Sequence, residues 1–231
     1  MRAASGSDGL RAQPLQHRLW ESVRLEAAGV AATRVAKNAS VYHSGDRADR
    51  VFFVESGRVK LLMLSPAGKE CLLGFHTPGH VFGELCLNGQ DSFRLETAVA
   101  MEETRLRSLP SQQFLALLRR EGLLEGFLQY LVGRIAQQQQ IITHLVTVDS
   151  EHRLAETLLM LARTLGRPDP ADTRIDSPIS HEELSQMVGT TRPRISEFMK
   201  KFRNLGLIHV TRERHLIVRQ AKLVAHLAAT A

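Results

Sequence analysis

The chain has 231 residues, of which 43% are hydrophobic, and it carries 30 Lys and Arg against 24 Asp and Glu. This length and composition suit two domains with buried cores, and the net charge of +6 favours a polyanionic partner. No apolar run reaches the roughly 18 residues of a membrane span, and the first residues lack the pattern of a signal peptide. We therefore expect a cytoplasmic protein with no membrane partner.

Cys71 and Cys86 are the only cysteines, and both lie in apolar, strand-like sequence. Such positions favour buried, reduced thiols. A redox role for either thiol stays open as an alternative, but it is disfavoured because neither has a resolving cysteine or a cluster of cations nearby in the sequence.

The first predicted elements are a tail and a short helix. Residues 1–18 are expected to form a flexible tail, because they are rich in Ala, Gly, Ser and Arg and have little to bury. The apolar face of the amphipathic helix that follows is predicted to carry Leu19, Trp20, Val23 and Leu25.

Residues 19–120 are predicted to form a β domain. From residue 34 to residue 109, short β-prone runs alternate with turns marked by glycine or proline. Strands separated by turn signals about every 8–12 residues are typical of an antiparallel sandwich or jelly roll. The predicted strands cover Ser40–Tyr42, Val51–Val54, Val59–Leu64, Glu70–Phe75, Thr97–Ala100 and Thr104–Leu109.

One long helix is predicted within residues 121–148, after a short helix over Ser111–Leu118. Its apolar positions recur at alternating spacings of four and three, which favours a parallel coiled coil between two chains and hence a homodimer. The alternative is a helix packed along the β domain of its own chain. Gln138 interrupts the seam and either fixes the register of the two chains or reaches into a ligand pocket. The predicted seam consists of Leu124, Leu128, Leu131, Ile135, Gln138, Ile142 and Leu145.

Residues 149–231 contain a predicted helix-turn-helix. A helix over Asp149–Leu165 and a loop over Gly166–Asp172 precede it. Ser180 is a good N-cap for its first helix, and Gly189 ends that helix. The second helix is capped by Thr190 or Thr191 and has proline in its first turn. Its predicted buried stripe consists of Ile195, Phe198, Met199, Phe202 and Leu205.

The opposite face of the second helix is basic. Two short β-prone runs within residues 206–219 enclose a polar turn, which predicts the hairpin wing of a winged helix. From Ile179 to Lys222 there are nine Lys and Arg against four Asp and Glu, so this segment holds +5 of the net +6. A basic face is often merely solvated, but this concentration favours double-stranded DNA as the partner. The predicted basic face carries Arg192, Arg194, Ser196, Lys200, Lys201 and Arg203.

The order of β-roll, long dimerisation helix and winged helix-turn-helix resembles the CRP/FNR family of bacterial transcription regulators over roughly residues 35–220. The resemblance is carried by Gly45, by Gly57 in Val-Glu-Ser-Gly-Arg-Val, by the Pro-Gly-His-Val-Phe-Gly-Glu-Leu run over 78–85, and by Val-Gly-Thr-Thr-Arg-Pro-Arg-Ile-Ser over 188–196. It implies an α+β fold with an N-terminal antiparallel jelly roll, a long dimerisation helix and a C-terminal winged helix-turn-helix. It also implies a homodimeric regulator that binds palindromic promoter sites and works with RNA polymerase.

In the nucleotide-binding members of that family, the Phe-Gly-Glu-Leu motif and a following arginine hold a cyclic phosphate and its ribose. Leu95 stands where the family has a small hydroxyl residue, and the negative charge of Glu96 follows it. Gln138 and Gln139 fall near the hydroxyl pair that reads adenine. A cyclic nucleotide, another small anion and no effector at all therefore remain open. The residues implied in effector binding are Gly83, Glu84, Leu85, Arg94, Leu95, Gln138 and Gln139.

Two other sensing modes occur in the family. Relatives with an iron–sulfur cluster use N-terminal cysteines, and none precedes Cys71, so no such cluster is expected. Haem-binding relatives use a histidine in the roll, which makes His76 and His80 candidates. Two histidines in a loop rich in Gly and Pro are, however, more often surface residues than ligands.

The resemblance also implies how the second helix contacts DNA. Base-reading side chains are expected from its first two turns, where arginine suits guanine and glutamate suits a cytosine amino group. Pro193 and Glu197 depart from the best-known members, so a different half-site is expected. The candidate base contacts are Arg192, Arg194, Ser196 and Glu197, and the candidate phosphate contacts are Ser180, Thr190, Thr191 and Lys200.

Two other functions compete with DNA binding. The first is a nucleotide or anion sensor that acts mainly through protein partners. The second is an enzyme, which is disfavoured because His181-Glu-Glu-Leu-Ser lacks the second histidine of a zinc-protease helix and Ala67-Gly-Lys-Glu lacks the rest of a phosphate loop. No Gly-x-Ser-x-Gly motif occurs. We therefore expect no catalytic residue and no metal site.

Overall fold

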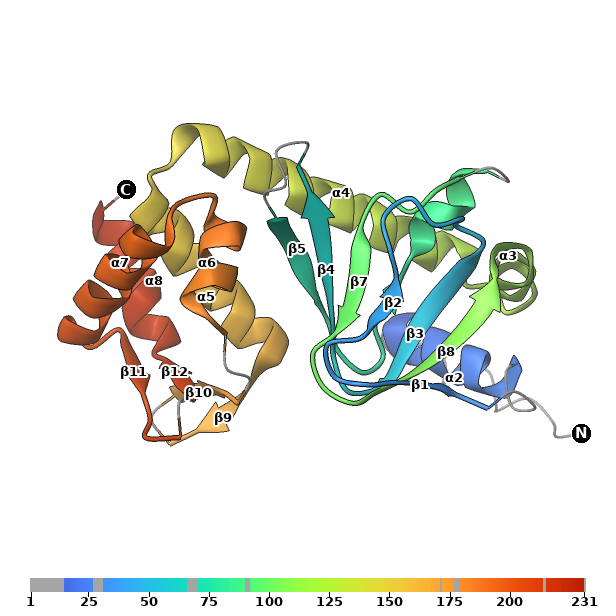
Figure 1. Ribbon diagram of the computed structural model, residues 1–231, viewed down its shortest axis with the longest axis horizontal. Helices are drawn as coiled ribbons and strands as arrows, with labels where there is room; N and C mark the ends of the chain where they lie inside the picture. The colour runs from blue at the N-terminus through green and yellow to red at the C-terminus, as the bar shows by residue number, and fades with distance from the viewer. Residues whose placement is uncertain are drawn as a thin grey trace, which may run out of the picture. The chain divides into compact units, whose positions relative to one another are not determined.

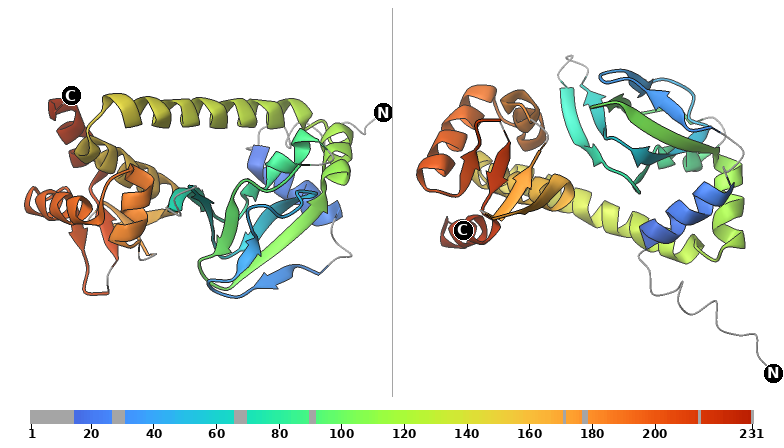
Figure 2. Two further views of the ribbon diagram at one scale, coloured as in Figure 1. Left: turned by 45° about the horizontal axis from the view of Figure 1, so that its top comes forward. Right: turned by 90° about the horizontal axis from the view of Figure 1, so that it is seen from below.

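The computed structural model describes residues 15–26, 31–65, 70–89, 92–170, 172–176, 179–213 and 215–230, with no account of the side chains of 137 and 230 (Figure 1). The chain divides into two compact units, one comprising Met1–Met63 and Gly74–Ala136 and the other Leu64–Leu73 and Gln137–Ala231. The division falls inside helix α4 (Leu124–Thr147), which is one continuous helix in both views of Figure 2.

The predicted jelly roll is present as two four-stranded sheets, which belong to the first unit except for Leu64 and Glu70–Leu73. Every predicted strand is present in the structure, and the observed bounds differ from the predicted ones by at most two residues at either end. Inward-facing Val59, Leu61, Ala98 and Ala100 alternate with outward neighbours on the paired strands β4 (Val59–Leu64) and β7 (Thr97–Ala100) and form part of the core between the sheets. The strand order of the first sheet is β1 (Thr33–Val35), β8 (Thr104–Pro110), β3 (Arg50–Ser56), β6 (Val81–Phe82). The strand order of the second sheet is β2 (Ser40–Tyr42), β7 (Thr97–Ala100), β4 (Val59–Leu64), β5 (Glu70–His76).

Helices cover the outer face of the first sheet. Leu19 and Val23 of α2 (Leu15–Glu26) join Phe114 of α3 (Ser111–Arg120) and Phe127 of α4 in one buried cluster against β3 and β8. Leu25 is 71% exposed, so its predicted place on the apolar face is wrong. Helix α2 begins inside the range predicted as a tail, whose residues 1–14 lie outside the described residues.

The second unit packs four helices on a small sheet. Its order is β11 (Ile208–Val210), β12 (Leu216–Val218), β10 (Asp172–Ile175), β9 (Gly166–Asp169), and its helices are α5 (Ser150–Leu165), α6 (His181–Val188), α7 (Arg192–Asn204) and α8 (Gln220–Thr230). The predicted loop over Gly166–Asp172 is wrong, because β9 and β10 pair antiparallel. Pro168 is tolerated there since β9 is an edge strand.

The two cysteines differ in environment. Cys86 is buried, and Cys71 is exposed on β5, at the edge of its sheet. The prediction of a buried thiol is therefore wrong for Cys71, whose side chain lies on the outward side of the alternating strand. Both thiols are free. The architecture as a whole confirms the predicted fold class of an antiparallel β domain followed by a helical helix-turn-helix domain.

Candidate DNA interface and effector site

The first helix of the predicted helix-turn-helix, α6, begins with a capping box. The Ser180 hydroxyl accepts from the Glu183 N–H (3.1 Å), and the Glu183 carboxylate accepts from the Ser180 N–H (3.0 Å). The helix ends at Gly189, which has φ +69°, a left-handed conformation that favours glycine. The sequence therefore sets both ends of α6 locally.

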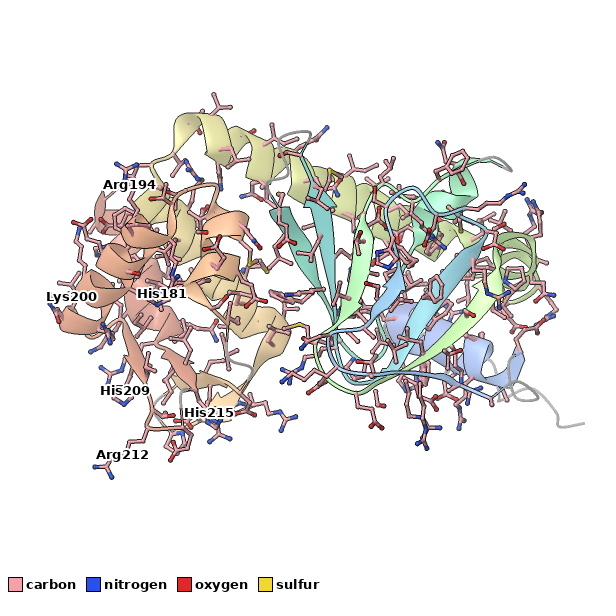
Figure 3. All side chains as sticks on the ribbon, viewed as in Figure 1. His181, Arg194, Lys200, His209, Arg212 and His215 are labelled. Carbon is pink, nitrogen blue, oxygen red and sulfur yellow. The ribbon has the colours of Figure 1, made fainter. Side chains whose placement is uncertain are left out.

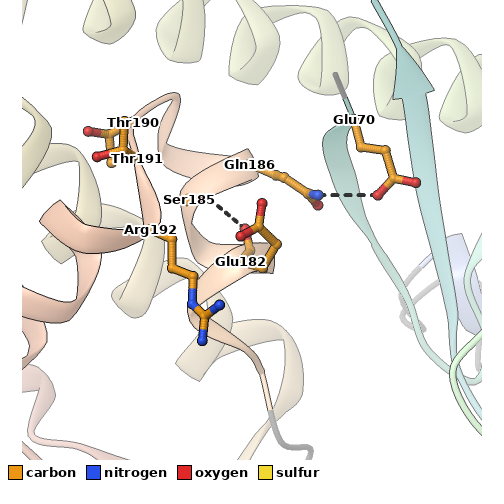
Figure 4. A pocket seen from close by; sticks show the side chains of 7 residues that line it. All are labelled: Glu70, Glu182, Ser185, Gln186, Thr190, Thr191 and Arg192. Atoms are coloured by element: carbon orange, nitrogen blue, oxygen red, sulfur yellow. Dashed lines mark hydrogen bonds between the residues drawn. The ribbon is translucent and has the colours of Figure 1, made fainter. Parts of the chain in front are cut away.

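The second helix, α7, starts at Arg192 immediately after the turn. Its N-cap is Thr191, which makes no side-chain capping bond to a described residue, and Pro193 stands in its first turn as predicted. Figure 4 shows Thr190, Thr191 and Arg192 at the start of α7, beside the bond from the Ser185 hydroxyl to the carbonyl oxygen of Glu182 (2.8 Å). Thr191 and Arg192 are exposed, so the N-terminus of α7 is accessible to solvent.

The buried stripe of α7 is shorter than predicted. Ile195, Met199 and Phe202 are buried, while Phe198 is only partly buried. Leu205 is 51% exposed, because the helix ends one residue before it. The side of α7 that faces the domain core therefore ends at Phe202.

The predicted base and phosphate contacts of α7 are all exposed, namely Arg192, Arg194, Ser196, Glu197 and Lys200. Figure 3 shows Arg194 and Lys200 on this helix and Arg212 at the wing. Lys201 is different, because its Nζ lies 2.7 Å from a carboxylate oxygen of Glu151 on α5. Lys201 is thus exposed on the basic face as predicted, but its charge is paired with Glu151.

The predicted wing is the hairpin of β11 and β12. Arg212 is exposed in its turn, and Arg214 lies outside the described residues. Arg219 donates from Nη1 to the carbonyl oxygen of Gly206 (3.1 Å), so it ties the end of the wing to the segment that follows α7. Arg212 is thus the wing cation that the structure leaves most accessible among the described residues.

His181 is a functional candidate that the sequence did not reveal. Its Nδ1 lies 2.8 Å from the Ser196 hydroxyl oxygen, and that hydroxyl is 3.1 Å from the carbonyl oxygen of Arg192. Burial and the charges of Arg192 and Arg203 lower the pKa of His181. Fifteen residues separate the histidine from the serine, so only the fold brings them together.

Arg94 is the centre of the candidate effector site. It is 3% exposed, and it donates to the carbonyl oxygens of Gly83 (2.8 Å) and Arg50 (2.6 Å). Its guanidinium lies 4.3 Å from the centroid of the Tyr42 ring and 5.4 Å from that of Phe52. Its Nε has no hydrogen-bond partner among the described residues. A buried cation with an unmet donor is a physically sensible place for an anionic group.

The carboxylates around Arg94 already have partners. Glu84 accepts a hydrogen bond from Arg134 of α4. The Tyr42 hydroxyl donates to a carboxylate oxygen of Glu96 (2.8 Å), and Glu96 is 4% exposed. Burial and the neighbouring Glu96 raise the pKa of Tyr42. Arg134 was missed by the motif, although it lies four residues before Gln138 and so on the same helix face.

The remaining predicted effector residues are exposed. Leu85 and Leu95 are 42% and 59% exposed, and neither side chain can offer a hydrogen bond. Gln138 and Gln139 are exposed on the part of α4 that belongs to the second unit. The structure therefore brings together Gly83, Glu84 and Arg94, while contact of the two amides with an effector stays a prediction.

His76 is buried on β5, so its expected place as a surface residue in a loop is wrong. Burial, helped by the charges of Arg134 and His80, lowers its pKa to about 3. Its Nδ1 lacks a hydrogen-bond partner within the described part of the chain. His80 is partly buried, and its Nδ1 accepts from the Thr77 N–H (3.3 Å). Both imidazoles are thus held neutral beside Arg134.

Neither a metal cluster nor a membrane span is found in the described part of the chain. In those residues, no three His, Cys, Asp or Glu side chains gather where they could hold a metal ion. None of the described helices is both long and apolar enough to cross a membrane.

Known proteins resemble both halves of the chain. A model of the cyclic nucleotide-binding domain matches residues 32–121, and a model of the Crp-like helix-turn-helix domain matches residues 152–226. The global nitrogen regulator of Synechocystis sp. is 34% identical over 180 residues, which cover 77% of this chain and 80% of that protein.

Two further relatives carry the likeness over most of their length. A CRP-like cAMP-activated global transcriptional regulator of Mycobacterium tuberculosis is 27% identical over 172 residues, or 74% of this chain and 76% of that protein. The crystal structure of a CRP-family transcriptional regulator from Thermus thermophilus superposes with a TM-score of 0.67 at 27% identity, covering 85% of this chain and 96% of the other. The chain belongs to the CRP/FNR family of transcription regulators.

Proposed function

We propose that this chain is a homodimeric, sequence-specific regulator that binds palindromic promoter DNA and is controlled by a small effector in its β-roll. The observation that carries the proposal is the exposed basic face of α7, which begins immediately after the turn and carries Arg192, Arg194 and Lys200. A helix with this charge suits the major groove, and a wing cation suits the adjacent phosphates. The protein acts by binding rather than catalysis, in the cytoplasm and together with RNA polymerase.

The proposed dimer forms through α4. Leu124 and Leu131 of the predicted seam pack partly against the core of their own β-roll. Five exposed apolar residues of α4 follow a neighbouring seam with the same alternating spacing, with Gln139 rather than Gln138 at its centre, and Ile141 and Leu145 are exposed beside it. An apolar row of this length is a costly surface to leave in water, which supports a second copy as its partner. The row consists of Leu128, Val132, Ile135, Ile142 and Val146, which are 54% or more exposed.

The proposed effector carries an anionic group. The unmet Nε of buried Arg94 supports this class. The relative from Mycobacterium tuberculosis is described as cAMP-activated, which supports a cyclic nucleotide. Leu95 cannot supply the hydrogen bond of a hydroxyl residue at that position, which supports a different small anion. Both kinds of effector would bind Arg94, so the binding experiment distinguishes them by comparing cyclic AMP with 5′-AMP and inorganic phosphate.

A regulator that needs no effector is the second candidate, and one observation favours it. Arg134 is already paired with Glu84, and Arg94 lies among Tyr42, Glu84 and Glu96. Two cations and two carboxylates balance in charge without a ligand. Such a cluster can hold the roll in one conformation by itself.

DNA recognition is tested by selection from a pool of random duplexes with the full chain. We expect an enriched palindrome whose half-sites lie about 10 base pairs apart. Arg192→Ala and Arg194→Ala should each weaken binding to that duplex about 5- to 150-fold, since a base contact contributes roughly 1–3 kcal/mol. Lys201→Ala is the matched control, because its charge is engaged by Glu151. No enrichment, or arginine variants that bind like the control, would refute DNA reading by α7.

Effector binding is tested by calorimetry with cyclic AMP, 5′-AMP and inorganic phosphate, followed by DNA titrations with each compound. A response to cyclic AMP alone supports a cyclic nucleotide, and a response to all three supports a general anion site. Arg94→Lys keeps the charge but loses the forked donors, so it should weaken either response. If none of the probes binds and DNA affinity is the same with and without them, the regulator without an effector is favoured.

A further inference from the structure

The hydroxyl of Ser196 is held between two groups at the start of the candidate DNA-reading helix. His181 Nδ1 stands 2.8 Å from the hydroxyl oxygen, and the carbonyl oxygen of Arg192 is 3.1 Å from it. Ser196 and Arg192 are one helical turn apart on α7, whereas His181 is the first residue of α6. A single imidazole therefore connects the two helices at the exposed face.

We propose that His181 is a positioning residue for α7 and that through it the affinity for DNA depends on pH. The inference rests on the proposed reading of DNA by α7. Among the described residues, His181 is the titratable side chain that forms a hydrogen bond with a candidate base contact of α7, namely Ser196.

Hydrogen-bond geometry gives the reason for the positioning role. A serine hydroxyl has one hydrogen to donate, and the Arg192 carbonyl can only accept. When Ser196 donates to that carbonyl, His181 must donate to the hydroxyl oxygen through an Nδ1–H. The imidazolium always carries this hydrogen, whereas neutral imidazole carries it in only one tautomer. Protonation of His181 therefore fixes the hydroxyl in one orientation.

The surrounding charges give the direction of the pH effect. Arg192 and Arg203 of α7 oppose the imidazolium, and burial opposes it further, so the pKa in the free protein lies below the ordinary value. On α6 the neighbours are Glu182 and Glu183, and the carboxylate of Glu183 is bonded to the N–H and hydroxyl of Ser180.

DNA phosphates brought against this face favour the imidazolium and raise the pKa of His181 in the complex. Binding therefore takes up a proton. Affinity rises as the pH falls between the pKa of the complex and that of the free protein, and it levels off below the latter. At constant ionic strength this rise is separate from the salt dependence of phosphate contacts.

Other histidines share this surface and need their own controls. His209 is exposed on β11, and Nδ1 of His215 lies 4.0 Å from Asp176. Figure 3 shows both on the wing, away from His181 at the start of α6. Their protonation also favours DNA in general, but neither forms a hydrogen bond with a described residue of α7.

The experiment is a fluorescence-anisotropy titration of the full chain with its selected duplex from about pH 8 to about pH 5.5, the range in which histidine titrates. The wild-type affinity should rise up to about tenfold for each pH unit inside the active window, the limit for uptake of one proton. His181→Gln keeps a hydrogen-bonding group but cannot titrate, so it should lose most of this rise. His17→Gln, on α2, is the matched control and should keep it.

A double-mutant cycle at the acidic end of this titration, about pH 5.5, tests the positioning role. His181→Ala and Ser196→Ala should each weaken binding, and the double variant should be no weaker than the worse single variant. Thermal unfolding of each variant excludes a general loss of folding. Additive effects, a full pH response in His181→Gln, or a response lost only in His209→Gln would overturn the inference. A wild-type chain that binds no duplex at any pH would instead refute the proposed function.

Discussion

Nη1 of Arg94 lies 2.8 Å from the carbonyl oxygen of Gly83, and a Cβ added to Gly83 would stand 2.7 Å from the same nitrogen. The φ of Gly83 is +76°, in the left-handed region that favours glycine. The glycine of the Phe-Gly-Glu-Leu motif is therefore required twice, by its backbone and by the approach of the arginine. This contact explains physically why the motif and an arginine eleven residues later occur together.

Gly83→Ala should destabilise the β-roll by more than backbone strain alone. The left-handed conformation costs an alanine about 1–2 kcal/mol, and displacement of the buried guanidinium adds to this. Gly79→Ala is the matched control, because Gly79 has φ +86° but open space around its Cβ position. Urea unfolding should show the larger loss of unfolding free energy in Gly83→Ala. Equal losses in the two variants would show that the Arg94 contact contributes nothing.

The stability of the β-roll should fall in mild acid because His76 is buried and neutral. Its pKa of about 3 lies below the ordinary value of 6.5, so the unfolded chain binds a proton between these pH values and the folded chain does not. Stability is therefore fully present above about pH 6.5 and falls as the pH decreases toward 3, with a loss from this group of about 2 kcal/mol at pH 5.

The acid effect is measured by unfolding His76→Phe, which fills the site without a titrating group, at a series of pH values. This variant should lose less stability than the wild type between about pH 6.5 and pH 5. His43→Gln replaces an exposed histidine of the same unit and serves as the control. An unchanged acid response in His76→Phe would assign the effect to other groups.

The fold was predictable where the pattern is local. Strands such as Val59–Leu64 and Thr97–Ala100 coincide with their predicted bounds, because alternation and turn signals both mark them. The strand Val81–Phe82 is too short to show a period, and β9 contains a proline that the sheet edge tolerates. Strand β9 pairs with the next strand, β10, so only its glycine and proline made it read as a loop. Val81–Phe82 depends on its pairing with Phe52 and Phe53, far earlier in the chain, which no local pattern reveals.

The candidate site was predictable only in part for the same reason. Arg94 and Gly83 were predicted by a motif, whereas Arg134 meets Glu84 across fifty residues. The partner of His181 is likewise on another helix. The motif also could not reveal that Glu84 is already paired, which leaves Arg94 Nε as the clearest unmet group beside it.

Ile135→Asp should disrupt the proposed dimer. A carboxylate at the centre of an apolar seam loses water without gaining a partner, and a symmetric dimer contains two of them. We expect the dissociation constant to rise at least about a hundredfold, since a cost of about 3 kcal/mol corresponds to that factor. Analytical ultracentrifugation measures the change, with Gln140→Asp as the control on an exposed position of α4 outside the row. If both variants keep the wild-type mass, α4 is not the interface.

Replacing Ser180 or Thr191 with alanine should have different effects on stability, although both residues are predicted phosphate contacts. Ser180 closes the capping box of α6, so its loss should lower the unfolding free energy of the second unit by about 0.5–2 kcal/mol. Thr191 is an N-cap without a capping bond to any residue that the structure describes, so its alanine variant should keep the wild-type stability. Thr191→Ala should still weaken binding to the selected duplex, because the exposed hydroxyl precedes the first turn of α7 and can reach a phosphate. Since this hydroxyl is neutral, the salt dependence of binding should stay unchanged. Chemical unfolding together with DNA titrations at two salt concentrations distinguishes the cases, and a Thr191→Ala variant that binds DNA like the wild type would remove this residue from the interface.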